Sequence, residues 1–330
     1  MNVLFSLLAV GVLIALGYLG GQVAGLRFVF GVVIPYAAIL VFIAGLVYKV
    51  IYWAKSPVPF RIPTTCGQET TLPWIKSSTL DNPHTTLGVL GRMALEVLFF
   101  RSLFRNTRME IKEGPRVVYG ENVYLWAAGL AFHWSFLIIF IRHFRFFTEP
   151  VPGFILAMQY VDGFMQIGVP VLYLTDLFLV AGLTFLFIRR LWSPQLRYIS
   201  QAADYFPLLL ILGVALTGIW MRHFTKTDIV GVKELAMGIV TFSPMVPESV
   251  GSVFFMHLIL VCSLFAYFPF SKLMHMAGVF LSPTRNLAND NRMVRHVNPW
   301  NPEVEVHTYA QWEEEFKDKL EAAEIPLDKD

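Results

Sequence analysis

Six long apolar runs divide the chain, and each is long enough to cross a lipid bilayer as a helix. A spanning helix needs about 20 mainly apolar residues. The runs cover residues 2–20, 28–53, 122–147, 168–189, 205–224 and 252–276. The first run has neither the positive n-region nor the clear cleavage site of a signal peptide, so we expect it to be retained. The pattern predicts an all-α membrane protein with six transmembrane helices.

The segment between the second and third runs, residues 54–121, is polar at first and then holds a shorter apolar stretch. Arg92, Glu96 and Arg101 interrupt that stretch, residues 87–104. The spacing favours an amphipathic helix at the membrane surface, with a poor seventh span as the alternative. We therefore predict two N-terminal transmembrane helices in 1–53, a cytoplasmic or interfacial segment in 54–121, a transmembrane domain in 122–280 and a cytoplasmic C-terminal tail in 281–330.

Lys and Arg are distributed unequally between the two sides of the predicted bundle. Nine lie in residues 54–121, three in 189–197 and four in 272–295, whereas the opposite side has six. Because cytoplasmic loops carry an excess of Lys and Arg, we expect both termini and the 54–121 segment to be cytoplasmic. The protein is predicted to lie in the cell membrane as a multi-pass protein.

Composition excludes several other classes of protein. Hydrophobic residues make up 55% of the chain and charged residues 15%, against about 25% charged residues in a soluble domain. The net charge of +2, without a basic run, excludes a nucleic-acid-binding protein. The two cysteines, Cys66 and Cys262, form no CxxC motif, so the chain lacks an iron–sulfur or zinc box of its own.

The last 30 residues have a different pattern. They hold ten acidic residues and three Lys, a net charge of −7. A helix with one apolar face is predicted from the positions of Tyr309, Trp312, Phe316 and Leu320. Thr308 and Gln311 fit a capping box at its start. A solvated tail is one interpretation; the apolar stripe favours docking to a basic surface of a partner.

Four of the eight histidines lie inside predicted spans: His133 and His143 on the third, His257 and His275 on the sixth. Ionisable residues at membrane depth are costly and are usually functional. A single such histidine could be structural and bond to a neighbouring helix, but two on each of two helices point to a common role.

The spacing of these histidines predicts their pairing. Ten residues of helix cover about 15 Å, and eighteen residues cover about 27 Å, or five whole turns. The third and sixth spans run in opposite directions, so His143 should meet His257 near the outer surface and His133 should meet His275 near the inner surface. Imidazoles that face each other across a bundle suit the axial positions of b-type haem. The sequence thus predicts a dihaem four-helix core with two haem b, each tilted to absorb the unequal spacings.

A proton relay built on histidine is the rival interpretation. A relay would pair the histidines with carboxylates in the membrane, and the spans have few, with Asp176 and Asp204 the nearest. Haem binding is therefore the favoured interpretation. The other histidines, His84, His296 and His307, lie in cytoplasmic segments and read as surface residues.

Basic residues surround the predicted outer haem. Arg142, Arg145 and Arg222 suit its propionates, because arginine pairs bidentately with carboxylate; snorkelling to the interface explains them equally well. His223 follows Arg222 as His143 follows Arg142, and it could replace His143 or His257 as a ligand. A place beside the outer haem, near a propionate or a quinone, fits His223 better.

A quinol oxidised at the outer haem would need a proton acceptor with an exit to water. The predicted outer segments offer several candidates, among which the sequence does not choose: Glu149, Gln159, Tyr160, Asp162, Gln166 and His223.

The histidine spacings resemble those of the gamma subunit of respiratory nitrate reductase, a dihaem cytochrome b, over about the third to sixth spans. The cytoplasmic segment adds the motifs PFRIPTTCGQ (59–68), LPWIK (72–76), DNP (81–83) and RSLFRN (101–106). With these the chain resembles the DsrM family, the membrane cytochrome b of the sulfite-reduction-linked DsrMKJOP complex; HmeC is the archaeal name of a similar subunit. The extra first span and the 54–121 segment set it apart from the nitrate reductase subunit.

This resemblance implies a function in dissimilatory sulfur metabolism. It implies that menaquinol is oxidised near the outer haem and that electrons pass to the inner haem. From there they reach a cytoplasmic iron–sulfur subunit related to heterodisulfide reductase, with the trisulfide of the sulfur carrier DsrC as the final acceptor. A periplasmic cytochrome c and a second membrane module complete the implied complex.

By position, the resemblance assigns His143 and His257 to the outer haem and His133 and His275 to the inner haem. It places Cys66, in the motif Cys66-Gly67-Gln68, where the iron–sulfur subunit docks; a tight turn with an inert thiol is the alternative. Two further alternatives stay open for the whole chain. Electrons could flow in reverse and reduce quinone, or the protein could be a transporter or membrane anchor with structural histidines and no haem.

Overall fold

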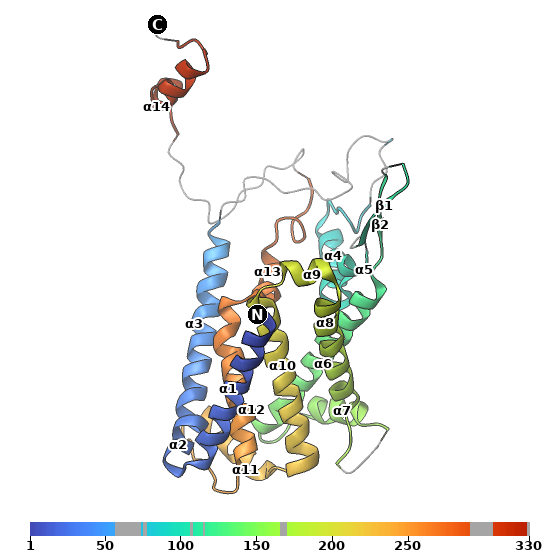
Figure 1. Ribbon diagram of the computed structural model, residues 1–330, viewed down its shortest axis with the longest axis vertical. Coiled ribbons are helices and arrows are strands. Elements are labelled where there is room, and N and C mark those ends of the chain that lie inside the picture. Colours follow the sequence, from blue (N-terminus) through green and yellow to red (C-terminus); the bar gives the residue numbers. More distant parts are fainter. Residues whose placement is uncertain are drawn as a thin grey trace.

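Helices form most of the computed structural model, which describes residues 1–56, 74, 78–105, 108–114, 116–165, 170–290 and 306–328. The long helices lie side by side in one bundle (Figure 1). They are α1 (Asn2–Gln22), α3 (Ile34–Ala54), α6 (Val123–His143), α8 (Leu174–Trp192), α10 (Ala202–Trp220) and α12 (Ser252–Tyr267). The predicted all-α class therefore holds for the described residues, apart from one short hairpin.

Shorter elements gather at the two ends of the bundle (Figure 1). The end that we call the α4 end carries α4 (Thr86–Phe99), α5 (Arg101–Phe104), β1 (Arg108–Lys112), β2 (Arg116–Gly120), α9 (Pro194–Ile199) and α13 (His275–Gly278). The opposite end, the α7 end, carries α2 (Ala24–Phe28), α7 (Gly153–Asp162) and α11 (Ile229–Val240). The remaining elements are the short helices η1 (Val29–Val33), η2 (Phe144–Phe146), η3 (Met221–Thr225), η4 (Phe268–Phe270), η5 (Lys272–Met274) and η6 (Val279–Leu281), and the C-terminal α14 (Tyr309–Ala322).

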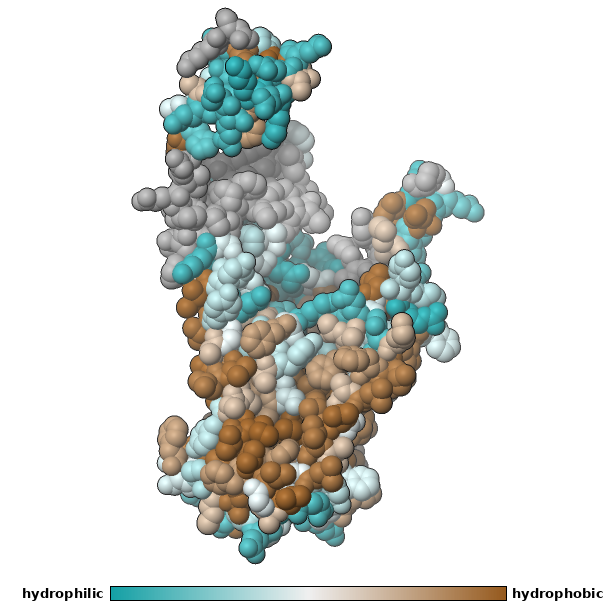
Figure 2. All heavy atoms as spheres, turned by 60° about the vertical axis from the view of Figure 1, so that its left-hand side comes forward, coloured by the Kyte–Doolittle hydropathy of each residue, from teal (hydrophilic) through white to brown (hydrophobic). Residues whose placement is uncertain are grey.

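Five helical segments of the described chain are long and apolar enough to span a membrane. They are Asn2–Gln22, Ala24–Ala54, Val123–Phe146, Ala202–Thr225 and Ser252–Phe270. Figure 2 shows apolar side chains along the flank of the bundle and hydrophilic ones toward its ends. The chain is thus a multi-pass membrane protein. The fourth predicted span corresponds to α8, which packs on α6 and α10 but carries Asp176 in its first turn and two arginines in its last.

The core of the bundle is built around α10. Leu210 of α10 is buried with Val10 of α1 and Leu260 of α12. On the other side, Ile211 of α10 is buried with Leu183 of α8. Because α10 contributes to both clusters, it holds the α6–α8 pair and the α1–α12 pair in one bundle.

The sixth predicted span is interrupted, which corrects the expectation of one continuous helix over 252–276. The α-helix ends at Tyr267, and Ser271 is extended, with φ −121° and ψ 174°. Pro269 explains the break, because proline lacks an N–H and its ring clashes with the preceding turn. The chain resumes as η5 and α13, and α13 begins at His275. The predicted five unbroken turns between His257 and His275 are therefore wrong.

Helix α4 occupies most of the stretch predicted to be an interfacial helix, and its faces are inverted relative to a helix of a soluble protein. Arg92 and Glu96 are buried, at 7% and 6% exposure, whereas Leu87 and Leu90 are 81% and 60% exposed. The N-terminus is capped by Thr85, whose side chain accepts a hydrogen bond from Gly88 N at 3.2 Å. The polar face of α4 is therefore packed against the rest of the protein, and its apolar face is exposed on the outside.

Two local features complete the comparison with the sequence. The pair β1 and β2 forms an antiparallel hairpin in a stretch for which no strand was predicted. The predicted capping box of the C-terminal helix is confirmed: Thr308 accepts a hydrogen bond from Gln311 N, and the Gln311 side chain accepts one from Thr308 N. The aromatic stripe of α14 is also present, since Trp312 contacts both Tyr309 and Phe316.

Candidate functional site

The four intramembrane histidines meet in two pairs. At the α7 end, His143 and His257 have ring centres 6.4 Å apart and planes 12° from parallel. Toward the α4 end, His133 and His275 have ring centres 6.0 Å apart and planes at 81°. With metal–nitrogen bonds of about 2 Å, two imidazoles that bind one metal ion from opposite sides have ring centres about 6 Å apart. Both pairs therefore have the separation that bis-imidazole ligation requires.

The packing of the bundle places these pairs between helices. Helix α6 packs mainly on α8, and α12 packs on α1, α3 and α10. The histidines of α6 and of the α12–α13 segment then reach across the bundle toward each other. The break at Ser271 resolves the mismatch between spacings of ten and eighteen residues, because His275 no longer lies on the axis of α12.

Each of three imidazoles has its Nδ1 atom bound to a backbone carbonyl. The Nδ1 atoms of His133, His143 and His275 lie 2.7, 2.7 and 2.8 Å from the carbonyl oxygens of Gly129, Ile139 and Lys272. A carbonyl only accepts hydrogen bonds, so Nδ1 carries the proton and the lone pair is on Nε2. A metal-binding histidine almost always donates its other N–H in this way, which fixes its tautomer and orientation.

The fourth imidazole uses a side chain for the same purpose. His257 Nδ1 lies 3.0 Å from Thr217 Oγ1, and the Thr217 hydroxyl donates to Gly213 O at 2.7 Å. The hydroxyl has a single proton, so it accepts from His257 Nδ1 and leaves Nε2 of His257 free. The sequence analysis missed Thr217, although a signal existed, because Thr217 is the one Ser or Thr in α10.

A buried group of charges lies next to His143. Arg142 is 8% exposed, and its guanidinium lies 2.9 Å from Asp162 and 3.2 Å from Asp176. The Tyr173 ring, which sequence reasoning also missed, lies 3.8 Å from the Arg142 guanidinium carbon and 4.2 Å from that of Arg222. Snorkelling thus fails to describe Arg142, which points into the protein.

The remaining quinol-site candidates at the α7 end differ in their contacts. Gln159 accepts a hydrogen bond from Arg145 Nη1 at 2.9 Å, which places both beside the group around Arg142. Glu149 pairs with Lys233 of α11, and Tyr160 is 79% exposed. Thus Asp162 and Gln159 are the candidates that the structure ties to arginines near His143.

Further contacts fix these residues in place. Both carboxylate oxygens of Asp162 accept from Thr175, from its N–H at 2.9 Å and from its hydroxyl at 2.6 Å. Arg222 donates to Val171 O through Nε and Nη2, at 3.1 and 3.0 Å. Loop and helix ends at the α7 end are therefore locked around the His143–His257 pair.

Two buried nitrogens at this end have neither a hydrogen-bond partner nor an ion-pair partner among the described residues: Arg142 Nε and His223 Nε2. Buried polar atoms are nearly always bonded, so an orphaned pair needs an explanation. A haem presents two propionate carboxylates, which suit the N–H of Arg142. Within the part of the chain that the structure describes, the Nε2 atoms of the four imidazoles also have no hydrogen-bond partner, so the residues present fit a haem.

Several predicted features lie outside the described residues. They are the 59–68 motif with Cys66, Gly67 and Gln68, the quinol-site candidate Gln166, and His296. Cys262 is buried in α12, which is consistent with its expected role as a small apolar side chain.

Comparison with known proteins adds a family. Residues 92–296 match the family model described as nitrate reductase gamma subunit. The chain is 43% identical over 281 residues to the Hdr-like menaquinol oxidoreductase cytochrome b-like subunit of Archaeoglobus fulgidus, covering 83% of this chain and 84% of that protein. The Archaeoglobus profundus protein of the same name is 40% identical over 280 residues, covering 83% of each chain.

A more distant relative matches a shorter part. The respiratory nitrate reductase 1 gamma chain of Escherichia coli is 30% identical over 115 residues, or 32% of this chain and 50% of that protein. The two resemblances found in the sequence, to the nitrate reductase gamma subunit and to the archaeal HmeC-type subunits, are thereby confirmed.

Proposed function

The chain belongs to the nitrate reductase gamma subunit family, and on that premise we propose that it is a dihaem cytochrome b that oxidises menaquinol in the membrane and passes electrons to a cytoplasmic partner. The name shared by the two archaeal relatives supports a role as the cytochrome b-like subunit of a quinol oxidoreductase complex. The observation that carries the finer proposal is the two histidine pairs, whose ring centres lie 6.0 and 6.4 Å apart, so that each pair would hold one haem.

His143 and His257 hold the outer haem in this proposal, and His133 and His275 hold the inner one. When bound, the two haems supply one-electron carriers at two depths of the membrane. The residues of the chain orient the ligands: three backbone carbonyls and Thr217 fix the Nδ1 protons. Arg142, Arg145 and Arg222 supply positive charge at the outer site.

The proposed topology has six spans. Five are the long apolar segments given above, and the additional one is α8, which is the fourth span along the chain. Its charges lie in its first and last turns, where the polar interface of the membrane is within reach. The positive-inside rule assigns the α4 end to the cytoplasm, and both termini with it. The exposed apolar face of α4 supports its placement at the membrane surface, because a lipid boundary removes that face from water.

Menaquinol would be oxidised at the α7 end, beside the outer haem. Oxidation of a quinol releases two electrons and two protons, so a proton acceptor must open to the outer water. Asp162 and Gln159 are the leading candidates for the hydroxyl contacts, because they are tied to Arg142 and Arg145. Glu149, Tyr160 and His223 are retained as candidates for the same site. Proton release outside and electron delivery inside would separate charge across the membrane.

The proposed partners follow from the family. They are a heterodisulfide-reductase-like iron–sulfur subunit in the cytoplasm, a periplasmic cytochrome c and further membrane subunits, within dissimilatory sulfur metabolism and with the DsrC trisulfide as the final acceptor. The acidic helix α14 would dock its aromatic stripe on a basic surface of the cytoplasmic subunit. The Cys66 motif is proposed to contact the same subunit.

The proposal is tested by haem content and by single substitutions. Purified protein should show the reduced-minus-oxidised spectrum of b-type haem, with about two haems per chain. His257→Ala should remove the outer haem and His275→Ala the inner one, each leaving the other. His307→Ala, which changes a histidine next to α14 that pairs with Glu315, serves as the control and should retain both. Folded protein without haem would refute the proposal and favour the transporter or membrane anchor.

A further inference from the structure

The last turn of α4 is fastened to α6 beside an inner histidine. Trp126 Nε1 donates to Phe99 O at 2.7 Å, and Trp134 Nε1 donates to Leu98 O at 3.0 Å. The carbonyls in the last turn of a helix have no partner within the helix. Two tryptophans of α6 supply the missing donors, and they lie on either side of His133 in the sequence.

The residue that follows this turn, Phe100, contacts the histidine itself. Its ring centre lies 4.8 Å from that of His133, edge to face at 76°. Phe100 has φ 50°, in the left-handed region that a bulky residue rarely adopts. Such a conformation persists only where surrounding contacts impose it. Leu103 of α5 supplies one, since it packs against Gly129, whose carbonyl binds His133 Nδ1.

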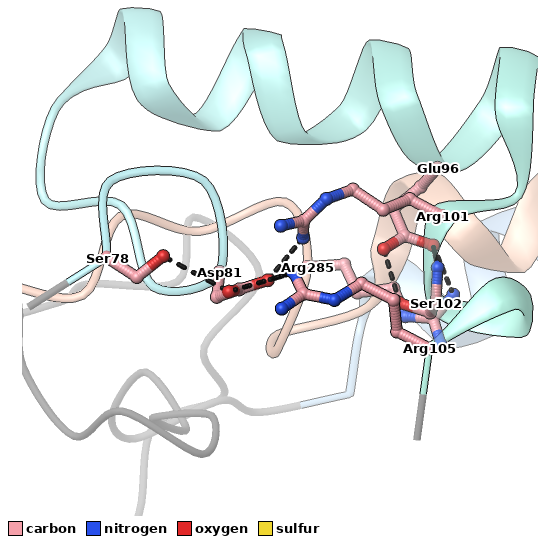
Figure 3. Close-up of polar contacts among 7 residues, drawn as sticks. All are labelled: Ser78, Asp81, Glu96, Arg101, Ser102, Arg105 and Arg285. Atoms are coloured by element: carbon pink, nitrogen blue, oxygen red, sulfur yellow. Dashed lines mark hydrogen bonds and ion pairs between the residues drawn. The ribbon is translucent and has the colours of Figure 1, made fainter. Parts of the chain in front are cut away.

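A buried carboxylate holds both sides of Phe100. The side chain of Glu96 is 4% exposed. Its oxygens accept hydrogen bonds from Ser102 N at 3.2 Å and from the Ser102 hydroxyl (Figure 3). Glu96 also lies 3.6 Å from Arg285, in the segment that follows His275. One carboxylate thus connects α4, α5 and the chain beyond the second inner ligand.

We propose that the elbow formed by residues 96–103 is a positioning element that sets the redox potential of the inner haem. Phe100 shields the His133 side of that haem from cytoplasmic water, and Glu96 holds Phe100 in place. This proposal rests on the two-haem function proposed above. The outer pair is at the other end of the bundle, so the elbow acts on one haem only.

The sign of the effect follows from charge. Ferric haem carries one more positive charge than ferrous haem, so water near the iron stabilises the ferric form. The apolar shell around a metal site controls its solvent access and its potential. Removal of the Phe100 ring should therefore lower the potential of the inner haem and leave that of the outer haem unchanged.

The experiment is a potentiometric titration of haem absorbance on the full-length protein. The inner haem is the redox wave that His275→Ala removes. We expect Phe100→Ala to lower the potential of that wave alone, and Phe100→Leu, which keeps an apolar side chain, to stay near wild type. The matched control is Phe99→Ala, because Phe99 directly precedes Phe100 but its side chain is 54% exposed. Both redox waves of this control should keep their wild-type potentials.

Glu96→Gln provides a second variant, with the EPR spectrum of the ferric inner haem as its readout. It removes the charge that faces Arg285 and weakens the bonds to Ser102, so the inner signal should shift while the outer signal stays. If Phe100→Ala binds no inner haem, the Glu96→Gln spectra decide the matter. Unchanged potentials in Phe100→Ala with two haems bound, equal shifts of both waves, or unchanged spectra in Glu96→Gln would overturn this proposal and leave the proposed function standing. A wild-type protein without haem would overturn both.

Discussion

Thr217→Val tests whether a side chain of α10 supports the proposed outer haem. The two side chains have nearly the same shape, and Thr217 is 8% exposed, so the substitution removes a hydroxyl with little change in packing. The Nδ1–H of His257 then loses its acceptor at 3.0 Å. The Gly213 carbonyl loses the hydrogen bond from the Thr217 hydroxyl but still accepts a backbone hydrogen bond within α10.

Two independent estimates of the magnitude agree. A buried N–H left without a partner costs about 1–3 kcal/mol. Loss of the hydrogen-bond partner of a metal-binding histidine typically weakens metal affinity about 10- to 100-fold, which is about 1.4–2.7 kcal/mol. We therefore expect outer-haem affinity to fall by one to two orders of magnitude. A weaker imidazole donor also favours ferrous iron, so the outer potential should rise.

The assay combines haem reconstitution with potentiometric titration, and the inner haem of the same protein is the internal reference. Thr241→Val is the matched control, because the Thr241 hydroxyl also bonds the carbonyl of the residue four positions back, at 2.8 Å to Met237 O, but Thr241 is exposed and directly follows α11. Thr217→Val with wild-type affinity and potential at the outer haem would refute the assigned role of this hydroxyl.

Three further predictions concern stability. Arg142→Ala leaves the buried Asp162 and the half-buried Asp176 without their cationic partner and should cost about 3–5 kcal/mol of unfolding free energy; a loss below about 1 kcal/mol in denaturation in detergent would contradict this. Gly17→Ala puts a Cβ within 2.7 Å of the α12 backbone and should cost about 1–3 kcal/mol, whereas Gly11→Ala, with open space around it, should cost nothing in the same thermal scans. The hydrogen bond from Arg101 holds the pKa of Asp81 below its usual range. The ionised Asp81 carboxylate therefore stabilises the fold above pH 3.8, its pKa in the unfolded chain. This stabilisation is lost as the pH falls through the lower pKa of the folded protein. The amide hydrogen-exchange rates of residues 78–105, corrected for the intrinsic rate, should be the same at pH 7 and pH 5. Asp81→Asn should raise these rates at both pH values.

The pairing of the histidines was predictable, because it depends on two quantities that the sequence contains. One is the rise of an α-helix per residue, and the other is the alternating direction of successive spans. Together they place His143 opposite His257 and His133 opposite His275 without any knowledge of the loops. The aromatic face and capping box of α14 were predictable for the same reason, since both depend on local periodicity.

The break in the sixth span was not predicted, although Pro269 was a visible signal. Eighteen residues of helix make five whole turns. A continuous helix would therefore already have placed His257 and His275 on one face, and no break was needed to explain their pairing. The partners of Arg142 could not be predicted either. They come from Asp162 at the end of α7, from Tyr173, and from Asp176 at the start of α8, and the apolar pattern does not encode how the ends of α6, α7 and α8 lie relative to one another. The role of Phe100 depends on a left-handed residue between two helices, which the apolar pattern does not encode.

The interruption at Ser271 has a consequence for how this protein tolerates changes of length. In an unbroken helix, one inserted residue rotates everything beyond it by about 100°, so a single insertion would turn His275 away from its partner. An extended residue between the two helical pieces absorbs such a rotation through its own dihedral angles. The segment between His257 and His275 can therefore change in length while His275 still faces His133.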